Sequence, residues 1–192
     1  MKEQENTTAA AQTIALGALI AAIYVVLTMI FAPISFGPIQ VRIAESLTAF
    51  LMFTPAAVPG LFVGCLIANI LGGAVLPDVI FGSLATLIGA VLGRKLFDKR
   101  WLFPIPMVLS NALIIPFVLR YGYGVEIPIP LMMVYIAGGE IVGCYILGEI
   151  LVSVLLKYGK RIVRSGDEYT ELSCGFPVTL LQPRGIHYSK EY

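Results

Sequence analysis

Charged residues are scarce in this chain of 192 residues: they make up 13% of it, whereas hydrophobic residues make up 58%. Globular soluble domains carry about 25% charged residues, so this composition excludes an ordinary soluble domain. From Thr13 to Pro77 the only charged residues are Arg42 and Glu45. Stretches with so few charges are typical of segments that lie in lipid, and they indicate a membrane protein.

Several functional motifs are also missing from the sequence. No Gly-Lys-Ser/Thr loop is present to hold nucleotide phosphates, so we expect any energy from ATP to come from a partner. The net charge of +1 argues against nucleic acid as a partner. The three cysteines, Cys65, Cys144 and Cys174, are odd in number and lack metal-binding spacing, so we interpret them as packing residues. We expect neither a metal nor another cofactor.

The apolar segments predict an all-α, polytopic membrane protein with six transmembrane helices. At about 20 residues per crossing, six crossings use about 120 residues and leave no room for an attached catalytic domain. The second segment is too short to cross the lipid core as a regular helix. The segments are 13–32, 43–53, 59–76, 79–92, 101–119 and a last one that begins near Pro128 or Pro130 and ends at Leu156.

The distribution of Lys and Arg predicts the orientation. With the N-terminus inside, the cytoplasmic side receives Lys2 and the basic clusters at 94–100 and 157–164, whereas the outside keeps only Arg42 and Arg120. We therefore predict a multi-pass protein of the cell membrane with both termini cytoplasmic. The first apolar run is too long for a cleaved signal and is interpreted as an uncleaved span. The predicted units are a cytoplasmic N-terminal segment (1–12), a six-helix substrate-binding domain (13–164) and a polar cytoplasmic tail (165–192).

A few polar side chains lie inside these apolar segments, where each needs a partner, a watery cavity or a ligand. On the predicted topology some lie near the outer surface and the others lie between the outer leaflet and mid-depth. We expect them to converge on one pocket that opens outward and binds a small molecule. The candidate substrate-binding residues are Gln40, Arg42, Glu45, Asn69, Asp78, Asn111 and Glu140.

For most of the candidates a simpler interpretation competes with ligand binding. Arg42 and Glu45 are three residues apart, a spacing that favours mutual neutralisation on one helix face over ligand binding. Glu140 follows two glycines in mid-span and has no Lys or Arg at its depth, which favours a ligand contact or a protonated carboxyl group. Glu149 lies nearer the cytoplasmic end, where it can reach the interface and pair with a basic residue.

The two asparagines suit the edge of a heterocycle, but hydrogen bonding between helices explains Asn69 and Asn111 equally well. Asp78 follows Pro77, and capping of the next helix is the default role for that position. For the four candidate stacking residues, a place at the membrane interface is favoured over ligand contact. These four are Tyr24, Tyr121, Tyr123 and Tyr135.

The first apolar segment also carries two small residues four positions apart, Ala18 and Ala22. They form a flat stripe that another helix can approach closely. Packing within the same chain uses the same device, so the stripe alone does not identify a partner.

Three stretches of the sequence resemble the QueT family, over approximately Thr13 to Lys160. They are Ile39-Gln-Val-Arg-Ile-Ala-Glu-Ser-Leu-Thr48, Pro59-Gly-Leu-Phe-Val-Gly-Cys-Leu-Ile-Ala-Asn69 and Phe81-Gly-Ser-Leu-Ala-Thr86. The members of this family are substrate-binding S-components of energy-coupling factor (ECF) transporters, assigned to the uptake of queuosine precursors. The tail after Arg164 takes no part in the resemblance.

The resemblance implies a six-helix membrane protein that captures a vitamin-like solute from outside and has no enzymatic activity. It implies docking on a transmembrane coupling protein, EcfT, which two cytoplasmic ATPases drive. S-components commonly contact EcfT through an Ala-x-x-x-Ala stripe in the first helix, and Ala18 and Ala22 match that motif. The expected substrate is a 7-deazaguanine such as preQ1, preQ0 or queuine.

The candidate residues are chemically compatible with such a ligand. A deazaguanine presents a ring N–H beside an exocyclic amine, which a carboxylate from Glu45 or Glu140 can accept, and its carbonyl needs a donor. Asn69, Gln40 or Arg42 can supply that donor. If the ligand also carries an aminomethyl cation, a second carboxylate has a role.

Two other functions remain as alternatives. The first is a self-sufficient secondary transporter of another small vitamin-like solute, although the two halves of the chain show no convincing repeat. The second is an intramembrane enzyme that uses Glu140 or Asp78 as acid or base, although no nucleophile and base occur in a recognisable spacing.

Overall fold

The part of the chain that the structure describes is built from helices alone. The computed structural model describes residues 2–36, 40–96 and 101–166. Its elements in chain order are α1 (Lys2–Ile30), α2 (Ala32–Ser35), the 3-10 helix η1 (Ile43–Met52), α3 (Ala57–Leu71), α4 (Leu76–Leu96), α5 (Ile105–Gly122), α6 (Ile129–Glu140), the π-helix η2 (Ile141–Leu147) and α7 (Gly148–Gly166). The predicted all-α class is confirmed.

Four helical segments are long and apolar enough to cross a membrane by length and composition. They are Ala10–Ile30, Leu76–Lys95, Ile105–Gly122 and Ile129–Lys157. The helices η1 and α3 are also apolar but shorter. The predicted count of six spans requires both shorter helices to count as crossings, so it stays a prediction.

Some predicted boundaries differ from the observed ones. The first helix starts at Lys2, so α1 includes residues 2–12 as well as most of the first predicted span. The third helix ends at Leu71 rather than Leu76, because Gly73 has a φ of +70°, a left-handed conformation that ends a helix. Most of the predicted tail, residues 167–192, and the basic residues Lys99 and Arg100 lie outside the described residues.

The second apolar segment forms a 3-10 helix, which lengthens it but does not make it long enough to cross the lipid core. A 3-10 helix rises about 2.0 Å per residue, compared with about 1.5 Å in an α-helix. The ten residues of η1 therefore reach about 20 Å instead of about 15 Å, still less than the lipid core of about 30 Å. A segment that ends within the bundle can present side chains to its interior.

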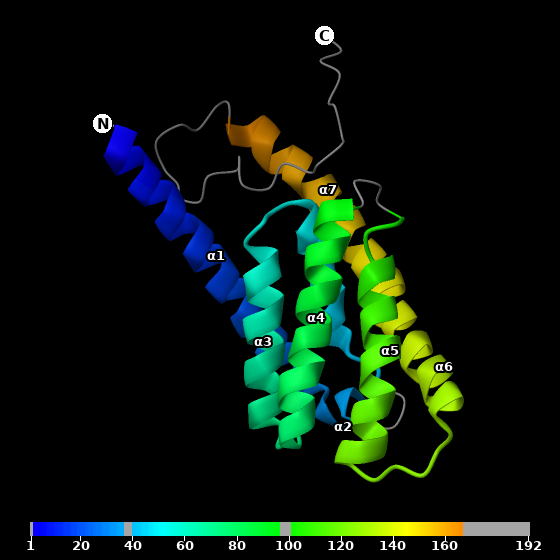
Figure 1. Ribbon diagram of the computed structural model, residues 1–192. Coiled ribbons are helices and arrows are strands. Elements are labelled where there is room, and N and C mark those ends of the chain that lie inside the picture. Colours follow the sequence, from blue (N-terminus) through cyan, green and yellow to red (C-terminus); the bar gives the residue numbers. More distant parts are fainter. Residues whose placement is uncertain (1, 37–39, 97–100, 167–192) are drawn as a thin grey trace.

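Figure 1 shows how the ends of the helices are grouped. The start of α1, the end of α4 and α7 lie at one end of the bundle. The opposite end holds α2, the α3–α4 connection and the α5–α6 loop. Arg94 and Lys95 belong to the first end, as the predicted topology requires, and its direction relative to the membrane stays a prediction.

Glycines allow α1 and α3 to approach closely. A Cβ atom on Gly60 would lie 2.8 Å from the Gly17 carbonyl oxygen, and one on Gly64 would lie 2.8 Å from Tyr24 Cβ. Neither distance leaves room for a side chain, so the glycines are needed for this contact. Because the two helices approach closely, Tyr24 lies in the interior, where it is 1% exposed and contacts Glu45 of η1.

Large apolar side chains also cover the outside of the bundle. Ile14, Trp101 and Leu76 are each about two-thirds exposed or more, at 73%, 66% and 69%. A soluble protein rarely exposes apolar surface so widely, whereas lipid is a good solvent for it. The polar residues lie inside, which is the reverse of a water-soluble fold.

Candidate functional site

The structure buries all seven predicted site residues inside the apolar bundle. They are Gln40, Arg42, Glu45, Asn69, Asp78, Asn111 and Glu140, and each is between 0 and 4% exposed. Buried polar groups are costly unless they are paired, so their partners define what the site can do.

Arg42 pairs with Asp78 rather than with Glu45. Its Nη2 lies 4.0 Å from Asp78 Oδ1, and both side chains are buried. The prediction of a self-neutralising Arg42–Glu45 pair was wrong because Arg42 precedes η1 in an extended conformation, with φ −91° and ψ 99°. The i, i+3 rule applies only when both residues are helical.

Tyr123 joins this pair from the end of α5. Its hydroxyl donates to Asp78 Oδ2 at 2.9 Å and accepts a hydrogen bond from the Val75 amide at 3.3 Å. Burial and the neighbouring Asp78 carboxylate raise the pKa of Tyr123 to about 12. The default helix-capping role of Asp78 is therefore replaced by contacts with Arg42 and Tyr123.

Glu45 and Glu140 lie close together among the same buried polar residues. The Tyr24 hydroxyl donates to Glu45 Oε1 at 2.6 Å, and the Cys144 thiol donates to Glu140 Oε2 at 3.4 Å. One ligand atom each from Glu45, Glu140 and Cys144 lies within 4.8 Å of the other two. Among the described residues this is a group that could hold a cation.

Cys65 links the polar residues of three elements. Its sulfur accepts hydrogen bonds from Arg42 at 3.6 Å, Asn69 at 3.7 Å and Thr86 at 3.5 Å. Asn69 also donates to the Asp78 carbonyl at 3.3 Å, so its interhelical role is present. Cys65 and Cys144 are both buried, as packing residues are, but they also bind polar groups, a function that their spacing does not reveal. Cys174 lies outside the described residues.

Two glycines provide space for these side chains, and the sequence offers no signal that identifies them. A Cβ atom on Gly82 would lie 2.7 Å from Asp78 Oδ1 and 3.2 Å from Asn69 Nδ2. One on Gly143 would lie 2.7 Å from the Arg42 carbonyl oxygen. The site thus depends on backbone surfaces without side chains in α4 and η2.

Several buried atoms of the site make no hydrogen bond with the described residues. These are Arg42 Nε and Nη2, Glu45 Oε2, Asp78 Oδ1 and both amide atoms of Asn111. Unsatisfied buried polar atoms are rare in native proteins and call for an explanation, such as a ligand. Gln40 adds a strained backbone, with a φ of +47°, which is unusual for a residue other than glycine.

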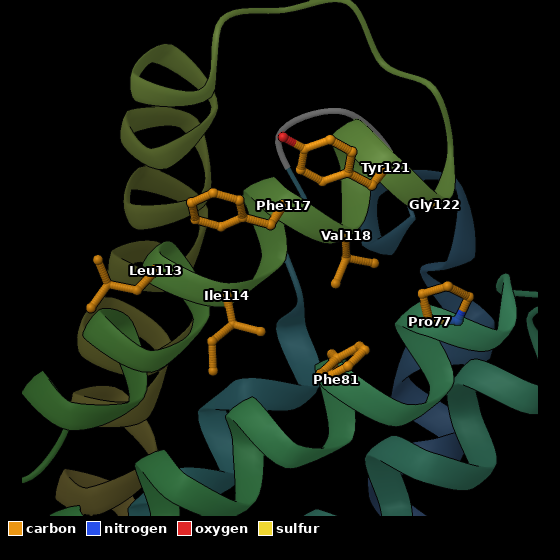
Figure 2. Close-up of a pocket in the computed structure, with 8 residues that line it drawn as sticks. All are labelled: Pro77, Phe81, Leu113, Ile114, Phe117, Val118, Tyr121 and Gly122. Atoms are coloured by element: carbon orange, nitrogen blue, oxygen red, sulfur yellow. The ribbon is translucent and has the colours of Figure 1, made fainter.

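Two pockets formed by described residues lie elsewhere. The first, of about 450 Å³, is an apolar groove between α4 and α5 with Phe81, Phe117 and Tyr121 in its walls (Figure 2). Such a wall resembles a lipid-facing surface more than a site with directed polar groups. The second, of about 430 Å³, contains Glu149 and Lys157 at the other end of the bundle.

Comparison with known proteins identifies the family. A family model described as QueT transporter matches residues 14–157. The chain belongs to the QueT transporter family. The predicted resemblance is therefore confirmed, and the chain is a membrane transport protein.

A curated relative is also similar to part of this QueT-family chain. It is the queuosine precursor transporter QueT of Lactococcus lactis subsp. cremoris (strain MG1363), which is 42% identical over 84 residues. The alignment covers 43% of this chain and 49% of the relative. The matched part thus spans about half the length of that relative. No solved structure matches the chain.

Proposed function

We propose that this QueT-family chain is the substrate-binding subunit of an ECF-type uptake transporter for a queuosine precursor. The observation that carries the proposal is the set of buried, unsatisfied polar atoms on Arg42, Glu45, Asp78 and Asn111. A polar ligand that enters the apolar bundle would satisfy these atoms, which explains why they are retained there. The named relative supports the class of ligand.

The Arg42–Asp78 pair suits the hydrogen-bonding edge of a deazaguanine. Asp78 Oδ1 can accept from the ring N–H and the exocyclic amine, and the Arg42 guanidinium can donate to the ring carbonyl. At 4.0 Å the contact between Arg42 and Asp78 is long for a direct hydrogen bond. A ligand that enters between them would therefore displace no strong hydrogen bond. The bonds from Tyr123 and Asn69 would hold the Asp78 segment in place.

Replacing Asp78 with asparagine is expected to weaken the binding of every deazaguanine by about 10- to 150-fold, because a charge-assisted hydrogen bond contributes about 1.5–3 kcal/mol. Calorimetric titration of the detergent-purified protein measures this change. Glu149→Gln is the matched control, since it removes a carboxylate from the second pocket at the other end of the bundle. An Asp78→Asn protein that binds as tightly as the wild type would exclude Asp78 from the site.

We propose that the coupling partner docks on α1 at Ala18 and Ala22. Both residues are exposed, whereas Gly17 and Ala21 on the adjacent stripe are buried, with Gly17 in close contact with Gly60 and Ala21 with Gly64. Packing within the chain therefore uses the neighbouring stripe and leaves Ala18 and Ala22 open to another helix.

The double substitution Ala18→Trp and Ala22→Trp is expected to abolish copurification with the EcfT-like coupling protein while precursor binding stays within about threefold of the wild type, a change below 1 kcal/mol. Two bulky rings prevent the close approach of helices that the small residues allow. Leu109→Trp, at a position that is 54% exposed on α5, is the control for adding a ring to the surface. Intact copurification of the double variant would show that the partner docks elsewhere. Uptake by the chain alone, driven by an ion gradient, would instead indicate a secondary transporter.

A further inference from the structure

The strongest unexplained feature of the site is its excess of negative charge. The buried charged side chains among the described residues are one cation, Arg42, and three carboxylates, Glu45, Asp78 and Glu140. Arg42 lies against Asp78, at 4.0 Å. Glu45 and Glu140 accept hydrogen bonds from neutral donors, Tyr24 and Cys144, and the single Arg42 charge acts on both of them as well as on Asp78. Two neighbouring carboxylates in an apolar interior favour a cation between them.

We propose that Glu45 and Glu140 bind a protonated primary amine of the ligand, so that the protein selects 7-aminomethyl-7-deazaguanine (preQ1) over precursors with a neutral substituent. This inference rests on the proposed function and names the substrate class for the same site. The base edge would lie at Arg42 and Asp78, and the substituent would point to the two glutamates. One proton retained on the carboxylate pair would make the occupied site neutral.

The spacing of the acceptors fits an ammonium group. Ligand atoms of Glu45 and Glu140 lie within 4.8 Å of each other. Two hydrogen bonds of about 2.8 Å through one nitrogen can bridge up to about 5.6 Å, so a single ammonium can reach both carboxylates. Glu45 Oε2 makes no hydrogen bond and is available to accept one.

Asn111 supplies an independent observation. It comes from α5, is 1% exposed and makes no hydrogen bond through either amide atom. Its side chain nevertheless lies near enough to Glu140 to interact with that carboxylate. A primary ammonium has three donors, and the Asn111 carbonyl would complete a set of three acceptors with the two glutamates.

A divalent metal ion is the rival occupant, because Glu45, Glu140 and Cys144 are all possible ligands. Metal binding requires the deprotonated thiolate of cysteine. In the structure the Cys144 sulfur is positioned as a donor to Glu140 Oε2 at 3.4 Å, and Tyr24 donates to Glu45. With its proton engaged in this bond, Cys144 is not a metal ligand, and the two carboxylates that remain suit an organic ammonium better than a metal.

Calorimetric titration of the full-length, detergent-purified wild-type protein with three deazaguanines tests the inference. The ligands are preQ1, the nitrile preQ0 and the 7-hydroxymethyl analogue, which matches preQ1 in size but is uncharged. We expect preQ1 to bind about 10- to 150-fold more tightly than the other two, the range for hydrogen bonds to charged groups. Equal affinities would overturn the inference and leave the proposed function standing, whereas no binding of any deazaguanine would overturn both.

A variant assigns the selectivity to the carboxylates. Glu140→Gln should reduce the affinity for preQ1 by about 10-fold or more and change that for preQ0 by less than about 3-fold. Equal losses for both ligands would contradict an amine site, and Glu149→Gln should change neither affinity. If Glu140→Gln does not fold, the wild-type comparison still decides. The proposal would be overturned if the protein binds Zn²⁺ tightly and a chelator abolishes its affinity for preQ1. Glu45, Glu140 and Cys144 would then form a metal site.

Discussion

Replacing Arg42 with methionine is expected to lower the free energy of unfolding by about 3–5 kcal/mol, the usual cost of removing one partner from a buried ion pair. Methionine fills much of the space of the arginine stem but carries no charge. Asp78 would then remain buried without its cation, beside a second group of two carboxylates. Thermal and chemical unfolding of the ligand-free protein in detergent measures this loss.

The double variant Arg42→Met, Asp78→Asn separates charge from packing. Removing both charges should recover most of the lost stability, because no uncompensated charge remains. The difference between single and double variants gives the coupling between the two residues. A single Arg42→Met variant as stable as the wild type, or a double variant no better than the single one, would show that the pair does not stabilise the fold.

The burial of these polar residues could be predicted from the sequence, because polar side chains are rare in segments that lie in lipid. Glu140 and Asn111 are polar residues in otherwise largely apolar segments, and both are buried. The end of the first helix could also be predicted, because Pro33 limits the apolar run, and α1 ends at Ile30. These inferences need only composition and local backbone chemistry.

The partners of these residues could not be predicted because they depend on the contacts between elements. Helical spacing pairs Arg42 with Glu45, but the extended backbone at Arg42 directs its side chain to Asp78 on α4. Cys65 has no distinguishing neighbour in the sequence, yet its sulfur meets Arg42 and Thr86 from other elements. Such pairings are established only when η1, α3 and α4 are packed together.

The π-helix after Glu140 is a further feature that the apolar pattern did not predict. The last segment was expected to be one transmembrane helix, and it contains seven residues in π geometry, from Ile141 to Leu147. A π-segment widens the helix and changes the direction of the side chains that follow, and such segments are frequent at functional sites. Within this π-helix the Gly143 backbone lies against Arg42, and the Cys144 thiol donates to Glu140.

Replacing Gly143 with alanine is therefore expected to weaken precursor binding by about tenfold or more and to lower the free energy of unfolding by about 1–3 kcal/mol, the range for overpacking. The new Cβ would lie 2.7 Å from the Arg42 carbonyl oxygen and 3.3 Å from Glu45 Cβ. A carbonyl oxygen cannot rotate away as a side chain can. The start of η1 must move, and Arg42 and Glu45 would move with it, away from Glu140.

Gly148→Ala is the matched control for this prediction, because it adds the same methyl group at the start of α7, directly after η2. There the nearest neighbour of the new Cβ atom, the Ser46 carbonyl oxygen, is at 3.7 Å. That distance is an ordinary van der Waals contact. Both substitutions also gain up to about 1 kcal/mol from the better helix propensity of alanine, so the comparison cancels this effect. Calorimetric titration and thermal unfolding of both variants would show the difference. Wild-type affinity in Gly143→Ala, or an equal loss in Gly148→Ala, would mean that contact between η1 and η2 does not hold the site together.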